Sequence, residues 1–264
     1  MNNGRRSTRG SRAAAVFVSD WFSRLQYGAI MQFAWLRRPQ PPAPVAIDLA
    51  DVRERARELI APGFMTFDEA CAAARDHVDV GYEDDDNGRR VDTVVLEVWT
   101  ERLAEQSTWT NPGDFSRVAA AFDDLGKMGI LARMNFACCV TCGTAEIDAE
   151  RTATEPDDIG YRFAEWAYTF FHMQDAEQLG DERADLYLSY SSFRPAPDLD
   201  PVLLSAAANG DADARLQVIA QTDQAVGRQI TDTLRAHGLR VDWDGDHNQR
   251  IRLIDVQWHK PLPQ

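Results

Sequence analysis

The spacing of apolar residues predicts helices throughout the first half of the chain. The first predicted helix follows Asp48, a residue type that favours the N-cap, and its apolar positions share one face: Leu49, Val52, Ala56, Leu59 and Ile60. A second begins after Thr66, because Glu69 three residues later completes a capping-box pattern, and runs through Cys71 toward Val80. Two further helices are predicted over about 91–106 and 113–127, with glycines closing the last one.

Strands and helices alternate in the second half. Strands are predicted over 130–136, 163–172, 185–190, 239–243 and 250–258, the last two as a hairpin, and helices over 139–150 and 212–237. Side chains alternate along a strand, which predicts a shared face for Trp166, Tyr168, Phe170 and His172. Prolines 195, 197 and 201 predict a loop. The whole pattern predicts an α+β fold: N-terminal helices, then a roughly five-stranded mixed or antiparallel sheet covered by two or three helices.

The first 46 residues differ in composition from the rest. They carry seven arginines and one aspartate, and they end in a proline-rich segment over 39–44 that is typical of a stiff linker. We therefore expect 1–46 to be a basic, disordered leader with a linker, and 47–264 to be a single α+β domain. The alternatives are a basic amphipathic helix on a membrane, from the aromatic stretch over 16–36, and a true start at Met31.

Charge and cysteine usage narrow the classes of function. The chain has 264 residues and a formal net charge of -14, which argues against a general nucleic-acid binder because phosphate contacts need clustered cations. No apolar run is long enough to span a membrane, and we expect a cytoplasmic protein with reduced thiols. Arginine outnumbers lysine 26 to 2, which fits a GC-rich, for example actinobacterial, genome. A protein partner is compatible with the acidic surface, and the oligomeric state is not predicted.

The chemical signal in the sequence is a cluster of three cysteines between a predicted strand and a predicted helix. Cys138, Cys139 and Cys142 fall within five positions, and the last two have the C-x-x-C spacing. A thiol at a helix N-terminus faces unpaired backbone N–H groups, which favour the reactive thiolate. The sequence contains no calcium-binding loop, no phosphate-binding loop and no dinucleotide-binding pattern. The acidic stretch over 83–88 is therefore expected to be a solvated turn.

Three interpretations of this cluster remain open. As a metal site, Cys138, Cys139 and Cys142 would bind zinc, with His172 as the best candidate for a further ligand. As a reactive-thiol site, whether redox or nucleophilic, the catalytic candidates are Cys139, Cys142, His172 and Asp175. As small buried residues, the cysteines would be structural, and the chain would be a non-catalytic protein-interaction module. Cys71, among alanines, is expected to be a buried apolar residue.

Three stretches of the chain form a recognisable combination: 134–147 with its Cys-Cys-x-x-Cys-Gly core, 170–177, and 241–245 with Arg250 and Ile251. Together they resemble an uncharacterised family of unknown function, seen mainly in actinobacteria. The resemblance covers about residues 50–260. It implies one folded unit and no known activity. The family commonly has glutamine at the positions of Val140 and Met173, so a polar role at those two positions is not expected here.

Overall fold

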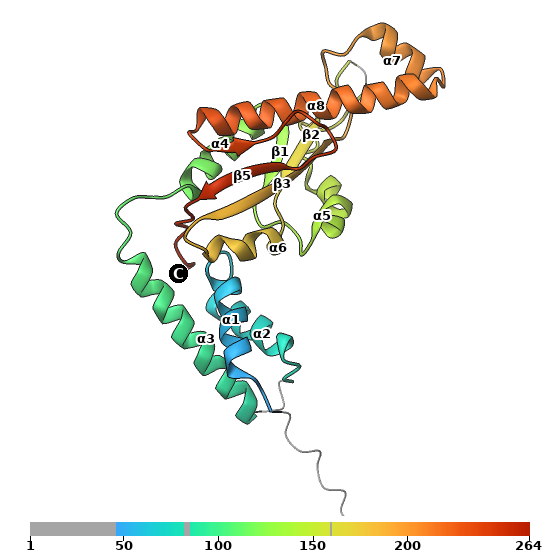
Figure 1. The fold of residues 1–264 in the computed structure, drawn as a ribbon. Coiled ribbons are helices and arrows are strands. Elements are labelled where there is room, and N and C mark those ends of the chain that lie inside the picture. Colours follow the sequence, from blue (N-terminus) through green and yellow to red (C-terminus); the bar gives the residue numbers. More distant parts are fainter. Residues whose placement is uncertain (1–45, 82–84, 159) are drawn as a thin grey trace, which may run out of the picture. The chain divides into compact units, whose positions relative to one another are not determined.

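The computed structural model describes residues 46–81, 85–158 and 160–264 (Figure 1). The predicted leader and linker fall outside these residues, apart from Ala46, and the single domain predicted over 47–264 stays a prediction. No helix in the described ranges is long and apolar enough to cross a bilayer.

Three helices form the first part of the fold. They are α1 (Leu49–Ile60), α2 (Phe67–His77) and α3 (Asp85–Gln106). The Asp48 carboxylate accepts a hydrogen bond from the backbone N–H of Ala50 at 2.9 Å, and the capping box between Thr66 and Glu69 is present, so both predicted helix starts are confirmed. The three helices share an apolar cluster that includes Val52, Ala56, Val91 and Val95.

The described part of the acidic stretch, residues 85–88, is the start of helix α3, which corrects the expectation of a solvated turn there. Helix α3 begins at Asp85, and Asn87 and Gly88 are buried within its first turns. A Cβ at position 88 would lie 3.0 Å from the Arg75 guanidinium, so the glycine allows Arg75 to cross this helix closely. Arg75 also donates to Asp92 at 2.8 Å, which joins α2 to α3.

The second part contains a five-stranded mixed sheet, which confirms the predicted α+β class. The strands are β1 (Ile130–Arg133), β2 (Ala167–Phe170), β3 (Ala184–Ser192), β4 (Val241–Asp242) and β5 (Ile251–Val256). Their order is β1-β2-β3-β5-β4. Strand β1 pairs with β2 in parallel, and all the other neighbours are antiparallel, including the predicted hairpin of β4 and β5.

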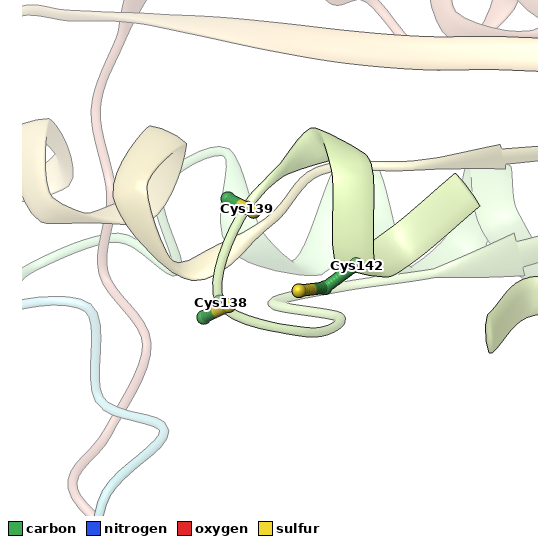
Figure 2. A group of neighbouring side chains, drawn as sticks. All are labelled: Cys138, Cys139 and Cys142. Atoms are coloured by element: carbon green, nitrogen blue, oxygen red, sulfur yellow. The ribbon is translucent and has the colours of Figure 1, made fainter. Parts of the chain in front are cut away.

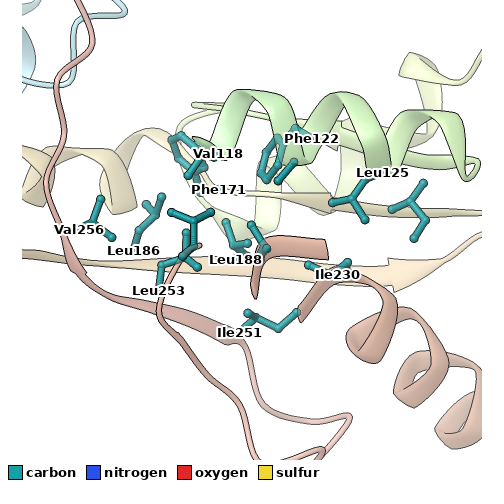
Figure 3. Packing of buried hydrophobic residues seen from close by; sticks show 14 of the residues in the cluster. Val118, Phe122, Leu125, Phe171, Leu186, Leu188, Ile230, Ile251, Leu253 and Val256 are labelled. Carbon is teal, nitrogen blue, oxygen red and sulfur yellow. The ribbon is translucent and has the colours of Figure 1, made fainter. Parts of the chain in front are cut away.

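Helices cover both faces of this sheet. The covering elements are α4 (Phe115–Lys127), α5 (Val140–Glu146) with the 3-10 turn η1 (Ile147–Glu150), α6 (Met173–Ala176) with η2 (Glu177–Gly180), and α8 (Ala212–Ala236). Helix α7 (Pro201–Ala208) has no buried residue and packs against α8. Buried residues of α4 and α8 pack on one face to form the main core (Figure 3). A smaller apolar cluster lies on the opposite face of β1 and β2, around Leu131, Ile147, Tyr168 and Phe170.

The strand predicted over 163–172 is much shorter than expected, which changes the surroundings of two residues. Of the four side chains predicted to share a face, only Tyr168 and Phe170 do so, in the smaller cluster. Trp166 precedes β2 and packs into the main core, and His172 follows β2 as the N-cap of α6. The predicted proline-marked loop is wrong from Pro201 onward, because α7 starts there.

Candidate metal and thiol site

The loop that carries the cysteines is held by backbone contacts with the segment after β2. Strand β1 ends at Arg133, and Asn135 and Ala137 then adopt positive φ angles of 52° and 59°. Between them, the backbone N–H of Phe136 donates to the Phe171 carbonyl at 2.9 Å. The N–H of Met173 donates to the Ala137 carbonyl at 3.1 Å. The left-handed residues turn the chain sharply, so the cysteines lie directly beyond the carboxyl end of β1.

Close packing fixes the helix that follows. The Phe136 ring lies edge-on to the Phe170 ring, with centroids 5.8 Å apart. Gly143, in α5, is buried against the same ring, and a Cβ there would lie 2.5 Å from Phe170 Cε2. Only glycine lets α5 approach β2 this closely, which gives a physical reason for the glycine directly after Cys142.

The three cysteine sulfurs gather around the first turn of α5 (Figure 2). The Sγ atoms of Cys138, Cys139 and Cys142 all lie within 4.8 Å of one another, and none forms a disulfide. Cys139 is the N-cap of α5. Cys138 is exposed, whereas Cys139 and Cys142 are half-buried. The sequence prediction of a cysteine cluster at a strand-to-helix junction is therefore confirmed.

Cys139 and Cys142 differ in their pKa values. The backbone N–H of Cys142, then the Cys142 thiol and further nearby groups, lower the pKa of Cys139 below its ordinary value. The Cys139 side chain makes no N-cap hydrogen bond of standard geometry, so these amides act on its thiolate mainly as nearby dipoles. Hydrogen bonding to the sulfurs of Cys138 and Cys139 raises the pKa of Cys142 to about 12. Cys139 is thus the first of the pair to ionise.

His172 and Asp175 form a separate buried network close to the loop. The His172 Nδ1 accepts a hydrogen bond from the backbone N–H of Asp175 at 3.2 Å, and Nε2 lies 3.1 Å from the Asp175 carboxylate. Arg250 donates to both oxygens of that carboxylate and to the Tyr187 carbonyl. Within the described residues, the group of potential ligands formed by the three cysteines does not include His172. Arg250 was not among the predicted site residues, and only its place in the family resemblance pointed to it.

The His172 network predicts a loss of stability in mild acid. Burial, with Arg250 adding to it, lowers the pKa of His172 below its ordinary value, although Asp175 and Glu177 oppose the shift. Below about pH 6.5 the unfolded chain therefore takes up a proton at this residue that the folded chain does not, and the free energy of unfolding falls. We expect His172→Asn, which keeps a capping acceptor, to flatten this dependence in denaturant titrations between about pH 7.5 and pH 5. An equally steep decline in the variant would contradict this assignment.

Cys71 lies apart from the cluster. It is half-buried and packs against the apolar cluster of α1–α3, so the predicted apolar character is supported although its burial is only partial. Burial raises the pKa of Cys71 to about 11, which keeps it a protonated thiol at neutral pH. It provides an internal control for any experiment on the other three cysteines.

The fold and this geometry define an α+β protein with three clustered cysteines at the end of a parallel strand. The family model for the domain of unknown function DUF6891 matches residues 46–262, so the chain belongs to that family. Comparisons with curated proteins and with solved structures find no match. The predicted membership in a family of unknown function is confirmed, whereas the actinobacterial distribution of the family and its Cys-Cys-x-x-Cys-Gly core stay predictions.

Proposed function

We propose that this protein binds a zinc-class metal ion through the thiolates of Cys138, Cys139 and Cys142. The observation that carries the proposal is the approach of three sulfurs to within 4.8 Å of one another. A tetrahedral zinc ion with Zn–S bonds of about 2.3 Å holds its sulfur ligands about 3.8 Å apart. The sulfurs therefore need only a small contraction to surround an ion, and side-chain rotations on a fixed backbone can supply it.

The proposed site leaves one coordination position for a further ligand. Three protein ligands with a free fourth position are typical of catalytic zinc sites, whereas structural sites use four protein ligands. Cys138 is exposed, so one side of the ion would face solvent, where water or a substrate atom could bind. In such a site the metal would act as a Lewis acid on the bound ligand. The loop contacts at Phe136 and Ala137 would hold the thiolates in place.

Metal titration of the reduced, metal-free full-length chain tests this proposal. Cobalt(II) should give a thiolate-to-metal charge-transfer band, and zinc should displace the cobalt and abolish the band. We expect Cys139→Ser to weaken zinc binding at least about a hundredfold, because even residues that only orient ligands contribute 10- to 100-fold. The matched control is Cys71→Ser, which should bind zinc like the unaltered chain. No band, or equal affinity in Cys139→Ser, would reject the metal site.

The same titration decides whether His172 is a fourth ligand. In the structure its Nδ1 accepts from Asp175 and its Nε2 faces a carboxylate, so ligation would require the ring to leave both. A loss of zinc affinity in His172→Asn as large as that in Cys139→Ser, and beyond the 10- to 100-fold effect of an orienting residue, would make it a ligand. Unchanged affinity would leave the fourth position to solvent, which is the result we expect.

Thiol redox chemistry is the second candidate for the same residues. It is favoured by the contrast between Cys139, whose pKa is lowered, and Cys142, whose pKa is raised to about 12. In this reaction the Cys139 thiolate would attack a substrate disulfide and release one thiolate. Cys142 would then give up its proton to the released thiolate, attack the mixed disulfide and release the second thiolate, so that the protein gains one disulfide and the substrate gains two electrons. Oxidation by glutathione disulfide of the metal-free chain, but not of the zinc-loaded chain, would show that both chemistries use one site.

A non-catalytic interaction module remains the alternative to both. In such a module all four cysteines could be buried structural residues. The exposure of Cys138 counts against this. Exposed apolar side chains on α7 and α8, namely Val202, Leu216 and Ile219, are the feature that favours it. A cytoplasmic location belongs with the metal and redox proposals, because a reducing compartment keeps the thiols available. The absence of nucleic-acid binding likewise stays a prediction.

A further inference from the structure

Lys260 stands out because the chain uses lysine only twice against 26 arginines. The other lysine, Lys127, pairs with Asp124 at 2.7 Å and is exposed. Lys260 has no carboxylate partner among the residues that the structure describes. Its Nζ lies instead 4.9 Å from the centroid of the Phe64 ring and 5.3 Å from that of Phe115.

The surroundings of Lys260 form a cleft of about 570 Å³. Its apolar lining comes from three separate segments and includes Phe64, Phe115, Phe122, Ile130, Ala132 and Met134. The rings of Phe64 and Phe115 both contact Trp258, at 6.2 and 5.2 Å between centroids, and Phe122 is buried. These contacts hold the aromatic lining in place, so the cleft is largely preformed, as small-molecule sites usually are.

None of the other charged groups that line the cleft forms an ion pair with Lys260. Arg133 pairs with Glu150 at 3.1 Å, and Glu165 accepts from the backbone N–H of Thr152 at 2.8 Å. Burial alone lowers the pKa of Lys260, so neither Asp123 nor Glu165 acts on it as a close counter-ion. An ammonium group over two aromatic rings gains cation–π attraction but keeps its full charge.

We propose that this cleft binds a small organic monoanion, whose carboxylate pairs with the Lys260 ammonium group and whose apolar body packs on Phe64, Phe115 and Phe122. The partly desolvated ammonium group would gain the counter-ion that the described residues do not provide, and a charge-assisted hydrogen bond of this kind is short and strong. The apolar lining selects for an aryl or medium-chain carboxylate over a small inorganic anion, which would bury none of these rings. The net negative charge of residues 47–264 works against anion binding elsewhere in that part of the chain.

The two lysines make this proposal directly testable on the full-length chain. Reductive methylation with ¹³C-formaldehyde labels Lys127, Lys260 and the N-terminal amine while keeping their charge. Titration with 4-phenylbutyrate should shift the Lys260 methyl signal in a saturable way and leave that of Lys127 unmoved. The neutral analogue 4-phenylbutanol should bind roughly tenfold or more weakly, because it lacks the charge-assisted hydrogen bond.

Two variants separate the charge from the packing. Lys260→Met keeps an apolar side chain over the rings and should lose roughly tenfold or more in phenylbutyrate affinity by calorimetry. Lys127→Met is the matched control and should bind like the unaltered chain. Near-ultraviolet circular dichroism of both variants verifies the aromatic packing around Trp258. Equal affinity for acid and alcohol, a Lys127 signal that shifts as much as that of Lys260, or full affinity in a folded Lys260→Met variant would each overturn the proposal.

Discussion

Replacing Asp175 with alanine is expected to lower the free energy of unfolding by about 3 kcal/mol, because it leaves a partly buried arginine without its counter-ion. Asp175 is 9% exposed, and its carboxylate accepts hydrogen bonds from both terminal nitrogens of Arg250 and from the backbone N–H of His172. The substitution therefore removes an ion pair and half of the capping box of α6 at once. Chemical denaturation at neutral pH measures the loss.

A neighbouring ion pair provides the control for this prediction. Arg252 pairs with Asp185, but both side chains are more than a third exposed. Water screens such a pair, so we expect Asp185→Ala to cost less than about 1 kcal/mol. Equal losses in the two variants would show that burial of the Asp175 pair contributes nothing.

The same substitution bears on the proposed metal site. Because the backbone N–H of Met173 in α6 donates to the Ala137 carbonyl, Asp175→Ala should also weaken the zinc binding proposed for the cysteine loop.

A methyl group at position 143 is expected to destabilise the protein by about 1–3 kcal/mol, which is the usual cost of overpacking. An exposed glycine inside a helix normally behaves in the opposite way, since alanine gains up to about 1 kcal/mol in helix propensity. At Gly143 the new Cβ would meet Phe170 Cε2 at 2.5 Å, and Phe170 is fully buried and cannot move aside freely. The clash therefore outweighs the propensity gain.

Gly126→Ala is the control, because the same substitution at this position should not destabilise the protein. Gly126 lies near the end of α4, and no atom lies within 4 Å of the place where its Cβ would stand. Gly126→Ala should therefore leave the protein unchanged or stabilise it by up to about 1 kcal/mol. A second substitution, Phe170→Leu, should recover part of the stability that Gly143→Ala loses. If Gly143→Ala were as stable as Gly126→Ala, the close approach of α5 to β2 would be wrong.

Features with a local cause could be predicted from the sequence. The starts of α1 and α2 follow from capping residues within three positions of the helix, and the structure shows the predicted hydrogen bonds. The cysteine cluster belongs to the same class, because its three cysteines fall within five consecutive positions at the start of one helix. Neither result depends on how distant parts of the chain pack.

Other features depend on contacts that the sequence does not display. The start of α7 is an exception, because Asp200 as N-cap and Pro201 at the first helical position are a local signal, and the loop prediction for Pro201 is wrong despite it. Helix α6 is only four residues long and is capped by a histidine, which no ordinary capping rule predicts. The partner of Asp175 could not be found by spacing either, because Arg250 lies 75 residues further along the chain.

The separation of the two apolar clusters of the sheet has a consequence for the dynamics of the cysteine site. The loop and α5 rest on the smaller cluster, which has four buried members, whereas α4 and α8 belong to the much larger main core. Regions with little buried apolar surface open at a lower free energy than the whole protein, so this corner of the sheet can unfold locally while the rest stays intact. An ion held by the three thiolates would bind only the closed form and would raise the cost of that opening by mass action. The fraction of molecules in which the cysteine loop and α5 are folded would then depend on the metal concentration. At low metal concentration this region would unfold locally while the rest of the fold stayed intact.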